Sequence, residues 1–286
     1  MMNSIKIILS GFSVSRRQWR VAAIVYFIQL CLALTLGMQV FDVLQASIGH
    51  SLEINKLLAQ YDHTVLTDFL KVHGASITPL IGQLRWLLLA WLLFSVFLNA
   101  GLLFCVSTKP ESKKSVTQAF WLGGATYFFP FLKINLIFLL LALAWAAMIC
   151  LPLAAFFEPS LQYFSSEKYF VWIAMALLMV FLTGLAVLFI WSVISRLLKI
   201  KTGTTVPKNV KHAWQILWVN KRGFVGLLTG FVGLQIMLII AYWLIEAFTG
   251  MTSAALILLL FIVQQVFVFL RIQLRQMMYA SVERLL

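Results

Sequence analysis

Six stretches of the chain are each long and apolar enough to cross a lipid bilayer, and they constrain the fold more than any other feature. A helix needs about 20 apolar residues to span the hydrocarbon core. The stretches cover residues 21–41, 86–106, 134–156, 169–194, 224–247 and 253–272. Because backbone N–H and C=O groups must be paired inside lipid, each stretch is expected to be an α-helix. The sequence therefore predicts an all-α polytopic membrane protein with six transmembrane helices.

The composition excludes most other classes of protein. Of the 286 residues, 62% are hydrophobic and only 11% are charged. A soluble domain is about half apolar and a quarter charged, so this chain has too little polar surface to face water on all sides. Soluble enzymes, disordered chains, nucleic-acid-binding domains and disulfide scaffolds are excluded together. We expect one integral membrane domain over residues 1–286, with a helical loop on the outer face at residues 42–85.

The distribution of basic residues predicts the orientation. Counting the N-terminal segment and every second connection, 18 of the 22 Lys and Arg residues fall on one side of the six stretches. Basic residues accumulate on the cytoplasmic side, so both termini are expected in the cytoplasm of a bacterial inner membrane. Anionic lipid of the inner leaflet then accounts for the net charge of +13, and no nucleic acid is needed as a partner.

Three segments on the predicted cytoplasmic side resemble one another. They are SIKIILSGFSVSRRQW from Ser4, SVTQAFWLGGATYFFP from Ser115 and NVKHAWQILWVNKRGF from Asn209. An alignment without gaps pairs Leu9 with Phe120 and with Trp214, and each segment precedes two apolar stretches. This pattern predicts three repeats of an interfacial amphipathic helix plus a transmembrane hairpin. The alternative is that any connections on the inner face resemble one another by residue class.

Two sets of polar residues are candidates for contacts with lipid or with a protein partner. In the third segment, Lys208 and Lys211 lie opposite the apolar Trp214, which suits a helix in the headgroup plane. Near the C-terminus, Gln264, Arg271 and Arg275 share a helical face and form a polar stripe that runs toward the cytoplasm. The alternative for the stripe is packing between helices together with an ordinary basic rim.

Four glycines predict a flat helix face for packing. Gly223, Gly226, Gly230 and Gly233 recur at helical spacing and include one GxxxG pair. Without side chains another helix can approach closely, from this chain or from a partner in a membrane complex.

Ionisable side chains near the middle of a span would indicate a functional site, and none is expected here. Arg196 and Arg271 fall near the ends of their stretches, where we expect them to reach water or headgroups. The outer loop contains His50, His63 and His73 without the spacing of a metal site, so neither a metal nor a cofactor is expected.

The pattern of amphipathic helix and hairpin, together with VQQVFVFLRIQLRQMMYAS from Val263 to Ser281, resembles bacterial six-helix inner-membrane proteins. These include the membrane domains associated with glycerophosphodiester phosphodiesterases, whose hydrolase domain is absent from this chain. No nucleophile elbow, P-loop or dinucleotide fingerprint occurs either. We therefore expect a non-enzymatic accessory subunit or scaffold of a membrane complex. The alternatives are a transporter or lipid-handling protein with a cavity between hairpins and, third, a membrane enzyme acting on lipids.

Overall fold

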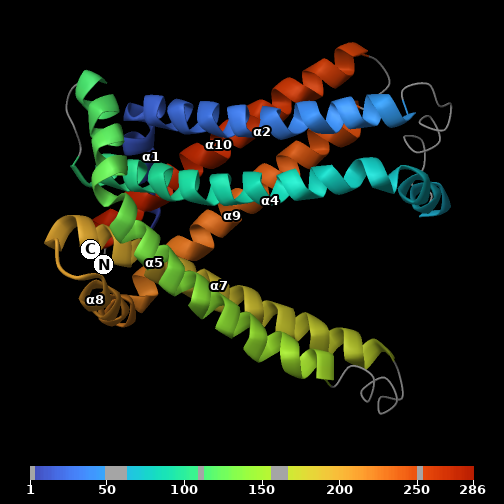
Figure 1. The fold of residues 1–286 in the computed structure, drawn as a ribbon. Coiled ribbons are helices and arrows are strands. Elements are labelled where there is room, and N and C mark those ends of the chain that lie inside the picture. The colour runs from blue at the N-terminus through green and yellow to red at the C-terminus, as the bar shows by residue number, and fades with distance from the viewer. Residues whose placement is uncertain (1–3, 49–62, 109–112, 156–166, 250–253) are drawn as a thin grey trace. The chain divides into compact units, whose positions relative to one another are not determined.

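A computed structural model of the chain describes residues 4–48, 63–108, 113–155, 167–249 and 254–286 (Figure 1). Within these residues the chain is helical apart from short turns, and they contain no strand. The helices are α1 (Ser4–Arg17), α2 (Trp19–Ile48), α4 (His63–Thr108), α5 (Lys113–Ala155), α7 (Glu167–Thr202), α8 (Val206–Val219), α9 (Lys221–Thr249) and α10 (Ala254–Leu285). The predicted all-α fold is confirmed.

The six predicted spans are also confirmed. Helices long and apolar enough to cross a membrane cover Trp19–Asp42, Gly82–Thr108, Val116–Ala155, Val171–Thr202, Lys221–Thr249 and Ala255–Leu285. Their outer surfaces carry large apolar side chains, such as Leu151, Trp172 and Met237, each at least 64% exposed. So much apolar surface is unfavourable in water and is covered by hydrocarbon in a bilayer. The chain is thus an integral, multi-pass membrane protein.

The described chain divides into two compact units. The larger unit joins Met1–Ala22 to Val96–Leu286, and the smaller unit, Ala23–Ser95, contains most of α2 and the first part of α4. Much of the loop predicted at residues 42–85 is helical, because α2 continues to Ile48 and α4 already begins at His63. His50 lies outside the described residues.

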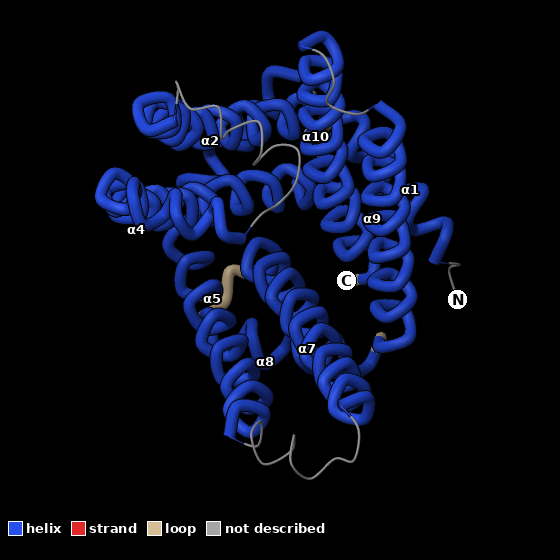
Figure 2. Tube along the Cα trace, turned by 90° about the vertical axis from the view of Figure 1, so that its right-hand side faces the viewer, coloured by secondary structure: helices blue, strands red, loops and turns tan. Residues whose placement is uncertain are grey.

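Within the larger unit, each short helical segment packs against a long helix. Helix α8 packs on α7, and the first part of α5 packs on the end of α4. Helix α1 packs on α10, so the first of the three similar segments contacts the hairpin that follows the third segment. Figure 2 shows α5 and α7 side by side as a hairpin, and α9 and α10 form another. The repeat itself stays a prediction.

The second repeat differs from the prediction of a separate interfacial helix. Helix α5 is continuous from Lys113 to Ala155 and changes direction partway along its length (Figure 1). Pro130 explains the bend, because it has no N–H for the carbonyl of Thr126 and its ring crowds the preceding turn. The first arm of α5 lies close against α4. A Cβ added at Gly101 would be 2.6 Å from the Phe120 carbonyl oxygen.

The helix bounds suggest a different register for the predicted repeat. Helices α1 and α8 are both 14 residues long. A single residue, Gln18 or Asn220, separates each from the long helix that follows. Matching these joints pairs Phe12 with Trp214, which differs by three residues from the predicted alignment of Leu9 with Trp214. A shift of three residues rotates a helix by only about 60°, so apolar residues still match apolar residues.

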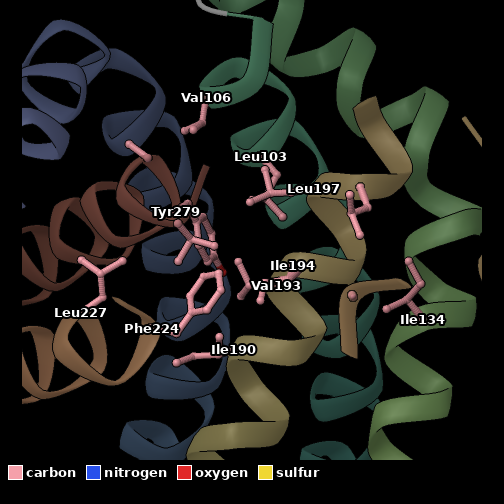
Figure 3. Packing of buried hydrophobic residues seen from close by; sticks show 14 of the residues in the cluster. Leu103, Val106, Ile134, Ile190, Val193, Ile194, Leu197, Phe224, Leu227 and Tyr279 are labelled. Carbon is pink, nitrogen blue, oxygen red and sulfur yellow. The ribbon is translucent and has the colours of Figure 1, made fainter. Parts of the chain in front are cut away.

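The core of the larger unit lies where α7, α9 and α10 meet. Figure 3 shows Ile190, Val193 and Ile194 of α7 near Phe224 of α9 and Tyr279 of α10, and all five belong to one buried cluster. A few residues further along each of these helices, Lys201 of α7 forms an ion pair with Glu283 of α10 at 3.4 Å.

Candidate functional site

Buried and half-buried polar side chains gather around this core, at the ends of the long helices that are predicted to be cytoplasmic. We call this group the inner polar cluster. Its members come from the joint after α1, from α4, α5 and α7, and from α10: Gln18, Asn99, Asn135, Ser192, Arg196, Arg275, Gln276 and Tyr279. Of these residues, the sequence predicts Arg275 as a contact with lipid or a partner, and it predicts that Arg196 is exposed near a span end.

Arg196 is the most unexpected member. Only 9% of the residue is exposed, so the expectation that it reaches water or headgroups is wrong. Its Nη2 donates to the Ser192 hydroxyl at 2.8 Å and to the Asn135 side-chain oxygen. Both acceptors are neutral. The sequence suggested exposure because Arg196 lies near a span end, but α7 continues to Thr202 and its neighbours cover this turn.

The predicted polar stripe of α10 is divided by the structure. Gln264 and Arg271 are exposed, and Arg271 lies over the Phe267 ring at 6.0 Å from its centroid. Arg275, one turn further, is half-buried and interacts electrostatically with Arg196. Only this arginine of the stripe therefore belongs to the inner polar cluster.

Two hydrogen-bonded links connect the first repeat to the last. Gln18 donates to the Cys105 carbonyl oxygen of α4 at 2.9 Å and accepts a bond of 3.0 Å from the Gln276 side chain. Tyr279 donates its hydroxyl to the Asn99 side-chain oxygen at 3.1 Å. Buried amides with partners on other helices fix how those helices pack, which assigns Gln18 and Gln276 a structural role.

Helix α8 presents different groups to its two sides. Lys208, Lys211, His212 and Gln215 are exposed and line a surface hollow of about 430 Å³ with Thr202, Thr204 and Asn209. On another side of α8, Trp214 packs against Trp191 of α7, with ring centroids 4.6 Å apart. Trp191 also donates its indole N–H to the Val210 carbonyl oxygen at 2.9 Å.

An apolar groove of about 710 Å³ runs between α5 and α7 and ends at α8. We call it the α5–α7 groove. Its lining consists of Leu141, Ala144, Trp145, Met148, Met179, Val180, Thr183, Gly184, Val187, Leu188, Trp191 and Trp214. A smaller groove of about 320 Å³ lies between α9 and α10 and includes Phe12 and Ser15 of α1. Phe12 and Trp214 are the residues paired when the joints are matched, so the two grooves occupy corresponding places.

Few polar groups in the α5–α7 groove are available to a ligand. The Trp145 indole N–H donates to the Phe181 carbonyl oxygen at 3.2 Å, and the Thr183 hydroxyl donates to the Met179 carbonyl oxygen at 2.8 Å. Trp191 donates to α8, as described above. Trp214 is the other lining residue with an N–H group in its side chain.

The glycines proposed for helix packing have different surroundings. A Cβ added at Gly230 would lie 2.7 Å from Ile8 Cδ1 of α1, and one at Gly223 would lie 3.5 Å from a Leu285 methyl group. A Cβ at Gly233 would meet no atom within 4 Å. Gly226 lies between them on α9. Of Gly223, Gly230 and Gly233, Gly230 therefore has the nearest neighbour, which is a side chain of α1.

The described residues contain no group of three or more His, Cys, Asp or Glu side chains arranged to hold a metal ion. Their fold defines the class of the protein as all-α and multi-pass in a membrane. No family model, curated protein or solved structure matches the chain. The resemblance to six-helix bacterial membrane proteins therefore stays a prediction.

Proposed function

We propose that this chain is a non-enzymatic protein of the bacterial inner membrane that binds membrane lipid in the α5–α7 groove. Its proposed orientation, with both termini in the cytoplasm, has support from the basic residues and from the contact of α1 with α10. The observation that carries the proposal is an apolar groove of ligand size whose polar side chains are largely used within the protein. Ligand pockets commonly measure about 300–1,000 Å³.

The chemistry of the lining favours a hydrocarbon chain as the occupant. A polar ligand in the groove would lose its hydrogen bonds to water and find few replacements, because Trp145, Thr183 and Trp191 already donate to carbonyl oxygens. An acyl chain makes no hydrogen bonds and therefore loses none in the groove. The groove ends at α8, whose Lys208 and Lys211 are exposed and suit anionic headgroups of the inner leaflet.

Native mass spectrometry of the full chain, extracted gently from its membrane, tests the proposal. Ala144→Trp fills the α5–α7 groove and is expected to lose one bound lipid relative to the unchanged chain. The control is Leu143→Trp on the same helix, since Leu143 is 57% exposed and does not line the groove. Equal lipid counts in the two variants would contradict lipid binding in the groove.

The same preparation tests the accessory-subunit function expected from the sequence. The specific feature in its favour is the hollow on α8, which gathers two lysines and His212 on an exposed face. Such a surface suits an acidic segment of a partner protein. A protein that copurifies in stoichiometric amount, and is lost in Lys208→Glu/Lys211→Glu, would support this second candidate.

A further inference from the structure

The two arginines of the inner polar cluster have no carboxylate partner. Arg196 bonds to Ser192 and Asn135, which are neutral. Arg275 is the charged group of α10 that acts on Arg196, and it carries the same sign. The two like charges thus interact in a largely buried place, and neither guanidinium has an ion pair in the described part of the chain. This arrangement leaves uncompensated positive charge among buried helices.

Both arginines also have buried N–H groups without an acceptor. The Nε atoms of Arg196 and Arg275 are inaccessible and have no hydrogen-bond partner. Guanidinium groups are always protonated, so these donors cannot be removed by a change of charge state. Buried donors are almost always satisfied in folded proteins, and a buried unpaired charge is strongly unfavourable. The two arginines therefore have buried donors and like charges that an anion from outside the chain can offset.

We infer that Arg196 and Arg275 together bind a phosphate group. A guanidinium presents N–H donors in a fork that matches the oxygens of a phosphate, and one anion between two arginines offsets the charge of both. Tyr279 also acts on Arg196 and lies one helical turn beyond Arg275. The phosphate belongs either to the headgroup of an anionic lipid or to free inorganic phosphate. This site is separate from the α5–α7 groove, and its test does not depend on the groove.

The site also explains why these residues lie where they do. Arg196 and Arg275 occur in the last parts of α7 and α10, the helix ends that carry the basic residues predicted to be cytoplasmic. Ionisable residues within spans mark binding sites. A ligand held by both side chains joins the second and third repeats.

Thermal unfolding of the purified full chain in a neutral detergent measures this binding. Inorganic phosphate is titrated against sodium chloride of equal ionic strength, and phosphatidylglycerol is titrated against phosphatidylcholine in mixed micelles. A ligand that binds only the folded state raises the melting temperature. We expect one of the two titrations to raise it by about 5 °C or more at saturation. A rise with inorganic phosphate identifies the free ion, and a rise with phosphatidylglycerol alone identifies the lipid.

Two variants locate the effect. Arg275→Gln removes one guanidinium and breaks no hydrogen bond seen in the structure, so it is expected to fold and to lose the stabilisation. The control, Arg271→Gln, removes the same charge from an exposed position one turn earlier and is expected to retain it. Arg275→Lys keeps the charge without the fork and should weaken the apparent affinity for the ligand by about tenfold or more. This variant provides the test if Arg275→Gln does not fold. No stabilisation by either ligand, or equal stabilisation in Arg275→Gln and Arg271→Gln, would overturn the inference.

Discussion

Replacing Gly11 with alanine tests the contact that links the first repeat to the third. A Cβ at this position would touch the Ser281 hydroxyl and lie 2.7 Å from the Met277 carbonyl oxygen. That oxygen belongs to the backbone of α10, so it cannot move aside as a flexible side chain would. The methyl group therefore forces α1 and α10 apart.

The magnitude follows from two opposing effects. Overpacking a close contact costs about 1–3 kcal/mol, and a backbone atom places this site near the upper end. Alanine in place of glycine improves helix propensity by about 1 kcal/mol. The expected net loss is about 2 kcal/mol, which lowers the melting temperature by about 4–8 °C in a chain of this size.

Thermal unfolding followed by tryptophan fluorescence in one detergent provides the assay. Gly233→Ala is the matched control, because a Cβ there meets no atom within 4 Å and the substitution should leave stability unchanged or slightly raised. Equal melting temperatures for Gly11→Ala and Gly233→Ala would refute the close packing of α1 on α10.

Gln18→Leu should destabilise the chain by about 1–3 kcal/mol, because it leaves the Cys105 carbonyl oxygen and the Gln276 amide unpaired in a buried place. In chemical or thermal unfolding, Gln18→Leu/Gln276→Leu should cost less than the two single changes added together; strict additivity would show that the pair does not interact. For the orientation, Gln60→Cys in a chain without its own cysteines should react with a membrane-impermeant maleimide from outside intact cells, whereas Thr204→Cys should react only after lysis. The reverse pattern would contradict the proposed topology.

The spans are predictable from sequence because the signal is a property of length and average polarity. Any run of about 20 apolar residues must be helical in lipid, whatever it packs against. The start of α5 is less predictable. The segment predicted to be interfacial and the span form one helix bent at Pro130, and the apolar pattern alone does not distinguish a bent helix from two helices.

The register of the repeat depends on contacts that the pattern of residue classes does not record. Phe12 and Trp214 each line a groove between two long helices, α9 and α10 for Phe12 and α5 and α7 for Trp214. On a helix, Leu9 and Phe12 share nearly the same face, so an alignment by residue class accepts either. Only the positions of the joints at Gln18 and Asn220 distinguish them.

Arg196 shows why the candidate site was largely missed. Its distance from the end of its apolar stretch predicts exposure, because a long side chain near a span end normally reaches water. The structure buries it because α7 extends further and because α5 and α10 bring Asn135 and Arg275 to the same place. Burial at a helix end is set by neighbouring helices, and one chain's sequence does not state which helices are neighbours.

Photocrosslinking in the native membrane tests the central proposal, lipid binding in the α5–α7 groove, most directly. A benzophenone amino acid in place of Val187 lies in the groove, and one in place of Leu143 lies outside it on the apolar surface. After irradiation, the intact mass of the first protein should show one dominant lipid adduct, at higher yield than the second. A dominant adduct with another protein at Val187, or equal lipid yields at the two positions, would contradict the proposal.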